Sequence, residues 1–317
     1  MGSTNPKVYR LFHNNLEVGP IFEQYDRDYF LNHILPDGKI QVRIQDDALK
    51  NDILGSDLKA LLEDLIQEIL SLDYRCSKYK NFIVLKQRDF NPKTHAGLII
   101  LKFKKYPFVV KIFMETPATF VSPFSKGFEP MIFFIMGSGI NRYLSGFSRL
   151  KNAEKIREII AKSSTWKDRV DVPRKWFWEP KDQKWFEVRS ENMGTHEHTV
   201  KLPSTYAIIC DAIDIDTSLD IFDTDHRKLG MELSHFLGVR IDPHITNFVI
   251  EKRTNKIIIV DTEHFPTMVG LREPLEFESY PEWYWQLMQK CFHDGFLRSK
   301  EKRLTIQYRD ETGIIAC

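Results

Sequence analysis

The 317-residue chain has few cysteines, and those that it has are scattered. They lie at positions 76, 210, 291 and 317, and no two of them have the spacing of zinc ligands. Four cysteines in a chain of this length are also far too few for a disulfide-stabilised scaffold. The sequence therefore excludes a small secreted disulfide fold and favours a reducing, cytoplasmic compartment.

The sequence also lacks an uninterrupted hydrophobic run of membrane-spanning length. Its most apolar stretch, residues 118–140, is broken by Lys126 and Glu129, so we expect no membrane span. The first residues do not have the pattern of a signal peptide. Gly2 does not begin a myristoylation motif, because position 6 is proline where the motif needs Ser or Thr.

An excess of one charge is absent from the chain as a whole but present locally. The net charge is +1, which argues against a general polyanion binder, and we expect no nucleic-acid partner. Residues 78–111 hold nine basic residues and one acid, whereas residues 211–225 hold six aspartates and no basic residue. The basic region could face phosphates or hold a polyanion, and the acidic region could attract a cationic substrate. Alternatively, both are solvated surface.

The pattern of apolar residues predicts a mixture of helices and strands. Residues 1–75 read as mainly helical, and residues 80–113 as an antiparallel meander of three β-rich runs. Residues 114–148, rich in proline, glycine and aromatics, are expected to form an insertion with at least one helix. Further elements are predicted at residues 149–163 (helix), 172–189 (hairpin), 206–210 (strand), 227–237 (helix), 248–260 (hairpin) and 274–303 (helix). This order is typical of an α+β fold with two lobes.

The strongest functional signal is a group of polar residues around the 248–260 hairpin. Asp242 lies in a loop before the hairpin, Asn247 follows five residues later, and Asp261 follows Asn247 by fourteen residues. A carboxylate in such a loop can orient a hydroxyl for attack, and an amide and a carboxylate on two arms of one hairpin can hold Mg²⁺. The alternative is that Asp242 is a turn residue and Asp261 caps a strand.

Lys111 is an isolated cation in the apolar run of residues 108–113. Because burying a charge alone is costly, this lysine is expected to face an anion. The alternative is an edge-strand lysine whose amine reaches water.

Together these residues resemble the catalytic loop, the metal-binding aspartate and the strand lysine of the protein-kinase-like superfamily. His244, two residues after Asp242, and Glu263, in Asp-Thr-Glu, make the segment similar to aminoglycoside phosphotransferases and choline kinases. Arg240 departs from the pattern, since those families usually have His or Tyr there. No Asp-Phe-Gly is present. The gaps suit divergent kinases such as those among bacterial effectors, which are delivered to the cytosol of a host cell, and they suit pseudokinases.

The resemblance implies roles for further residues. Lys111 would bind the phosphates of ATP and pair with a glutamate of the 149–163 helix, for which Glu154 and Glu158 are candidates and Glu158 is preferred. Gly97 would be the glycine that remains of the family's glycine-rich loop. Backbone groups from Asp211 to Ile213 would meet the adenine base.

The resemblance also implies a domain division and an activity. A helical extension would span residues 1–77, a β-rich N-lobe residues 78–213 and a helical C-lobe residues 214–317. The expected activity is transfer of the γ-phosphate of ATP, with Mg²⁺ or Mn²⁺, to a hydroxyl of a protein or a small molecule. The alternative is an inactive pseudokinase that binds a nucleotide or a polyanion.

Two other interpretations fit the residues less well. A metal hydrolase would use His196, His198, His244, His264 and Glu263, but their spacing matches no zinc motif. Gly137 and Gly139 suggest a nucleotide-binding turn, but the third glycine of that motif is missing, as is the Gly-Lys-Ser/Thr of a P-loop. We interpret this segment as a loop.

Overall fold

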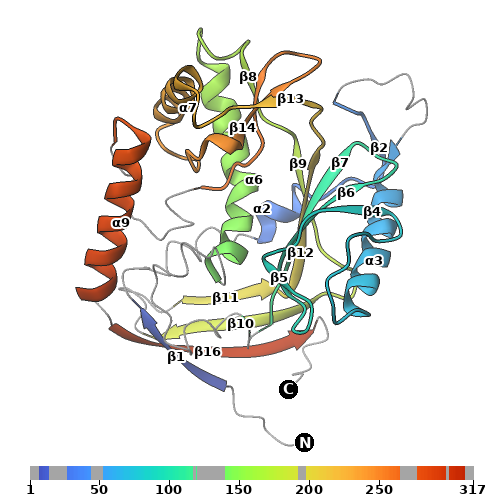
Figure 1. Ribbon diagram of the computed structural model, residues 1–317. Coiled ribbons are helices and arrows are strands. Elements are labelled where there is room, and N and C mark those ends of the chain that lie inside the picture. Colours follow the sequence, from blue (N-terminus) through green and yellow to red (C-terminus); the bar gives the residue numbers. More distant parts are fainter. Residues whose placement is uncertain are drawn as a thin grey trace, which may run out of the picture.

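The computed structural model describes residues 7–13, 27–43, 53–116, 119, 140–191, 198–264, 277–297 and 300–310, in which helices occur beside antiparallel sheets (Figure 1). The predicted α+β class is confirmed. Most of the predicted insertion, including Gly137 and Gly139, lies outside the described residues, as does His196. No helix in the described part of the chain is long and apolar enough to cross a membrane.

A six-stranded sheet contains the predicted meander. Its central strands are β6 (Ala96–Phe103) and β7 (Phe108–Met114), and all its pairings are antiparallel. The order is β4 (Phe82–Lys86), β6, β7, β12 (Thr205–Asp211) and β9 (Lys175–Trp178), with β5 (Phe90–Asn91) paired to β6. The strand predicted at residues 206–210 is β12, so this part of the prediction is confirmed.

Helix α3 (Gly55–Leu70) covers one face of this sheet, and α6 (Ile140–Ala161) lies on the other side (Figure 1). The buried stripe of α3 includes Leu58, Leu62 and Leu65, which belong to one hydrophobic cluster with Val110 and Ile112 of β7. Since side chains alternate along a strand, the residue between them, Lys111, points to the opposite face. That face carries the candidate site.

A second hydrophobic cluster joins α6 to the segments that follow β12. A four-stranded sheet has the order β13 (Ile215–Ser218), β14 (Phe248–Glu251), β15 (Ile257–Ile259), β8 (Val170–Asp171). Ala153, Ile156 and Ile160 of α6 pack in one cluster with α7 (Thr224–Phe236) and this sheet. The predicted 149–163 helix, 227–237 helix and 248–260 hairpin are confirmed, although α6 starts nine residues earlier than expected.

A third sheet differs from the prediction. Its order is β1 (Lys7–His13), β16 (Lys300–Asp310), β10 (Lys184–Glu191), β11 (His198–Pro203). The predicted 172–189 hairpin is therefore wrong, because β9 pairs with β12 whereas β10 pairs with β11 and β16.

The two regions predicted as helical contain strands as well as helices. The N-terminal region has α2 (Arg27–Leu31), β2 (Lys39–Ile40) and β3 (Ile53–Leu54) in addition to β1 and α3. In the C-terminal region, α9 (Tyr280–Leu297) ends before β16 begins. Strands β1 and β16 pair with each other across most of the chain, and a pattern of neighbouring residues does not show such a partner.

Candidate active site

The loop around Asp242 is fixed by buried neighbours and by hydrogen bonds. Ile241 and Ile245 are both buried in the second cluster. The Asp242 carboxylate accepts a 3.0 Å hydrogen bond from the His244 backbone N–H, and the Asn247 side-chain amide donates to the Asp242 carbonyl at 3.0 Å. Because both ends of this short segment are anchored, the Asp242 carboxylate has a defined direction and stays partly exposed.

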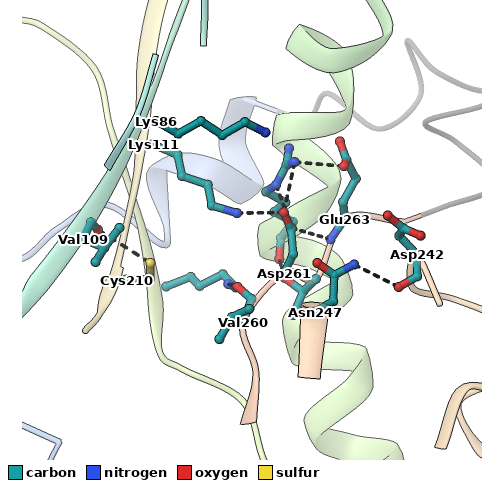
Figure 2. A network of polar contacts seen from close by, with 12 residues as sticks. Lys86, Val109, Lys111, Cys210, Asp242, Asn247, Val260, Asp261 and Glu263 are labelled. Carbon is teal, nitrogen blue, oxygen red and sulfur yellow. Dashed lines mark hydrogen bonds and ion pairs between the residues drawn. The ribbon is translucent and has the colours of Figure 1, made fainter. Parts of the chain in front are cut away.

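Asp261 lies directly beyond β15, close to the same loop. The Val260 backbone N–H donates to the Asn247 carbonyl at 3.0 Å, and the Glu263 N–H donates to the Asp261 carboxylate at 3.1 Å. Figure 2 shows the Asn247 side chain between Asp242 and Asp261, with its amide nitrogen on the Asp242 side. The structure thus brings together the three residues selected from the sequence.

Lys111 reaches Asp261 across the space between the two sheets. Its ammonium lies 2.8 Å from Asp261 Oδ2, and its side chain is 10% exposed. Lys111 therefore faces an anion, as expected, and the alternative of an amine in open solvent does not apply.

The expected partner of Lys111 on α6 is not found. Glu158 is exposed and pairs with Lys155 at 3.4 Å, and Glu154 binds His33 at 2.6 Å. The reason is the orientation of α6. Its inward stripe runs through Ala153, Ile156 and Ile160, which places Glu158 on the outer face.

The residue of α6 that enters the site is Arg149, which the sequence reasoning missed. Its Nε lies 2.9 Å from Asp261 Oδ1, and its Nη2 lies 2.9 Å from Glu263 Oε2. Arg149 is four residues before Ala153, so it continues the inward apolar stripe by one turn. A cation in that stripe was the signal that could have identified it.

Lys175 is a second residue that was missed. In the sheet it is paired with Cys210, and Cys210 is paired with Val109, two residues from Lys111. Both lysines therefore project from the same face of the sheet. The pKa of Lys175 is lowered to about 8, mainly by burial and also by the nearby Lys111, against the opposing effect of Cys210.

The two aspartates differ in protonation. Burial raises the pKa of Asp242 to about 7, with added repulsion from Glu263 and Asp261, although the His244 N–H opposes the shift. Burial would raise the pKa of Asp261 too, but Arg149 and Lys111 outweigh it and hold that pKa well below its usual range. At neutral pH, Asp261 is thus a fixed anion and Asp242 can gain or lose a proton.

Gly97 is required by the backbone. Its φ is +114°, and a Cβ at this position would overlap the Asp89 carbonyl. The preceding His95 binds the Leu72 carbonyl at 3.0 Å, which ties the turn to the end of α3. In the sheet Gly97 pairs with Met114 of β7, three residues from Lys111.

Asp211 is occupied within the protein. Arg174 donates to its carboxylate at 2.7 and 2.9 Å, and the Asp211 and Ala212 N–H groups donate to the Arg174 and Pro107 carbonyls. Of the segment expected to meet a base, Ala212 and Ile213 are the two residues that stay partly exposed.

The side chains of the site bear on whether it can hold a metal ion. In the described residues, no group of three or more His, Cys, Asp or Glu side chains could hold a metal, which leaves the metal-hydrolase alternative without support there. Asp261 and Asn247 supply one carboxylate and one amide oxygen. This set fits Mg²⁺, which takes few protein ligands and completes its shell with water and phosphate.

Comparisons with known proteins identified no family and only weak structural similarity. The sequence matches no protein-family model and no curated protein. Two crystal structures of mutant forms of the Mycobacterium tuberculosis PknI kinase domain match at 10% identity and a TM-score of 0.23. The matches cover 70% of this chain and 76% and 77% of those chains. A similarity this low does not define the fold, so the function has to be argued from the geometry of the site.

Proposed function

We propose that this chain is a phosphotransferase of the atypical kinase type, which transfers the γ-phosphate of ATP to a hydroxyl group. The observation that carries the proposal is the convergence of Lys111, Asp261, Asn247 and Asp242 on one place. They come from a sheet strand, the end of a hairpin and the loop before it. Phosphoryl transfer depends mainly on such positioning and on charge.

The sheet offers separate surfaces for the base and the phosphates of a nucleotide. Val109 and Cys210 face the site beside Lys175, and Val109 is partly exposed. Lys111 lies two residues further along β7, so a base against Val109 would direct its phosphates toward Lys111.

Asp242 would accept the proton of the attacking hydroxyl. A general base works best when its pKa lies near the working pH, and the Asp242 pKa of about 7 meets this condition. Magnesium, when bound through Asp261 and Asn247, would neutralise phosphate charge. The acceptor would be a protein or small-molecule hydroxyl.

One contact pattern favours a second candidate, an inactive nucleotide-binding protein. Both oxygens of Asp261 already accept contacts from Lys111, Arg149 and the Glu263 N–H. A carboxylate has about four lone-pair sites, so a metal ion would have to replace one contact. The 3.4 Å contact with Arg149 Nη2 is the longest.

The test is ATP turnover by the wild type and by Asp242→Asn. Asn keeps the shape of the side chain but cannot accept a proton, so turnover should fall about 10²–10⁴-fold while Mg-ATP binding is retained. Asp73→Asn, at an exposed loop position, is the matched control. Equal turnover in Asp242→Asn would remove Asp242 from this role. Binding of Mg-ATP without turnover by the wild type would favour the inactive candidate.

A further inference from the structure

Arg149 has a hydrogen-bonding group that nothing in the described part of the protein uses. The side chain is only 4% exposed, and its Nε and Nη2 groups are engaged by Asp261 and Glu263. Its Nη1 is buried without a hydrogen-bond partner among the described residues. A buried unpaired donor costs about 1–3 kcal/mol, so an unfilled guanidinium edge indicates a missing acceptor.

The charges around Arg149 indicate the sign of that acceptor. Lys111, Lys175 and Arg149 converge on two carboxylates, Asp261 and Glu263. These contacts raise the pKa of Arg149 despite its burial, so it stays charged. Lys111 and Lys175 add two further cations beside Arg149, so an anionic acceptor would suit the unused donor of Arg149.

Lys86 is a further cation on the same side of the sheet. It lies in the same cross-strand row as Lys111, through Ile100 of β6. Figure 2 shows the side chains of Lys86 and Lys111 extending from the sheet on the same side. Its ion pair with Asp89 is 3.2 Å long, and its side chain is 40% exposed, so it can turn toward a ligand.

We propose that Arg149 is a phosphate-binding residue, which meets the phosphate chain of the nucleotide through its Nη1 edge. The inference rests on the proposed function and extends it. A guanidinium presents several N–H donors in a plane that matches phosphate oxygens. Asp261 and Glu263 fix the opposite edge, so the free edge is oriented before the ligand arrives.

The experiment measures the affinity for inorganic tripolyphosphate, without metal, by isothermal titration calorimetry. Arg149→Lys keeps the charge but loses the planar donor edge, and we expect binding at least 10-fold weaker. The double variant Arg149→Met/Glu263→Gln removes one charge of each sign, which protects the fold if Arg149→Lys is unstable, and it should lose binding to the same extent. Arg157→Lys, on the same helix and bonded to the Pro173 carbonyl, should bind like the wild type.

The outcomes separate this inference from the proposed function. If the wild type binds Mg-ATP and tripolyphosphate while both Arg149 variants bind tripolyphosphate as well as it does, Arg149 only supports Asp261 and the inference is overturned. If the wild type fails to bind tripolyphosphate, the inference is overturned and the proposed function depends on Mg-ATP binding alone. If tripolyphosphate binding depends on Arg149 but Mg-ATP does not bind, Arg149 is a phosphate ligand and the proposed function fails.

Discussion

Asp242 and Asp261 are carboxylates of one site whose environments act in opposite directions. Asp261 faces Lys111 and Arg149, which hold it ionised. Asp242 has only the His244 N–H and the Asn247 amide to favour its charged form, and burial dominates. Neighbouring titratable groups whose environments shift their pKa values in opposite directions are common in active sites where one group must stay charged and the other must transfer a proton.

The raised pKa of Asp242 predicts a pH-dependent cost in stability. In the unfolded chain an aspartate has a pKa of about 3.9, whereas folded Asp242 has a pKa of about 7. Between these values the folded protein holds the extra proton, so the free energy of unfolding falls as pH rises through this window and the cost is complete above about pH 7. Such a shift corresponds to at most about 4 kcal/mol, and partial exposure of the side chain reduces it to roughly 1–3 kcal/mol.

Asp242→Asn should therefore be more stable than the wild type at pH 8.5, by roughly 1–3 kcal/mol in urea unfolding, and nearly equal to it at pH 4.5. The same substitution should lower turnover about 10²–10⁴-fold, so stability and activity change in opposite directions. Asp73→Asn is the control at both pH values. A gain of equal size at pH 4.5 and pH 8.5 would show that ionisation of Asp242 is not the cause.

The candidate site could be predicted only where a residue interrupts a local pattern. Lys111 stands out in an apolar strand, and Asp242, Asn247 and Asp261 flank a recognisable hairpin. Lys175 does not stand out, because it follows Arg174 and precedes three aromatics in a tract that is already rich in charged residues. The resemblance favours Glu158, but the rotation of α6 about its axis is set by its packing in the second cluster and on Tyr206 of β12, and that rotation selects Arg149.

At the scale of elements, α6 lies close to the sheet because of one small residue. A Cβ on Gly146 would overlap the Tyr206 hydroxyl and lie 2.8 Å from Phe113 Cζ. The Phe113 and Tyr206 rings stack at 4.7 Å, and Phe147 stacks on Tyr206 at 4.1 Å. This close approach positions Arg149, less than one turn further along the helix.

Gly146→Ala should destabilise the protein by about 1–3 kcal/mol through overpacking. Helix propensity alone would favour alanine by up to about 1 kcal/mol, so the sign of the change identifies the dominant effect. Urea unfolding measures it. Gly38→Ala, where a Cβ would meet nothing within 4 Å, should stay within about 0.5 kcal/mol of the wild type. Stabilisation by Gly146→Ala would show that α6 does not need this approach.

Elements with local sequence signals were predicted well, and their distant partners were not. Strands β4, β6 and β7 follow one another closely in the chain and pair in that order, so the order of the meander follows from the sequence. Strands β9 and β10 were identified near the right residues, but β9 completes one sheet and β10 enters another. A four-residue strand with three consecutive aromatics gives no indication of which sheet will bury it, since that depends on where β12 and β16 lie.

At the scale of the whole molecule, two hydrophobic clusters are joined by ion pairs. The sheet cluster contains α3 and the six-stranded sheet, and the hairpin cluster contains α6, α7, β14 and β15. Lys111 connects them through Asp261, and Arg43 connects them through Asp171 and Glu251. The N-terminal residues predicted as an extension belong to the sheet cluster, since Leu35, Ile40 and Ile53 are part of it.

If the two clusters unfold independently, a cavity made in one cluster should lower the stability of that cluster first. Leu62 of α3 and Leu233 of α7 are both fully buried, one in each cluster. Replacing either by alanine should cost about 2–5 kcal/mol. Hydrogen exchange should then accelerate in β6 and β7 for Leu62→Ala, and in α7 and β14 for Leu233→Ala, because units that open independently report only their own loss of stability.

The two variants serve as controls for each other. Uniform acceleration in both would show instead that the ion pairs and the buried face of α6 make the molecule a single cooperative unit. Binding at the site would then act on the whole chain.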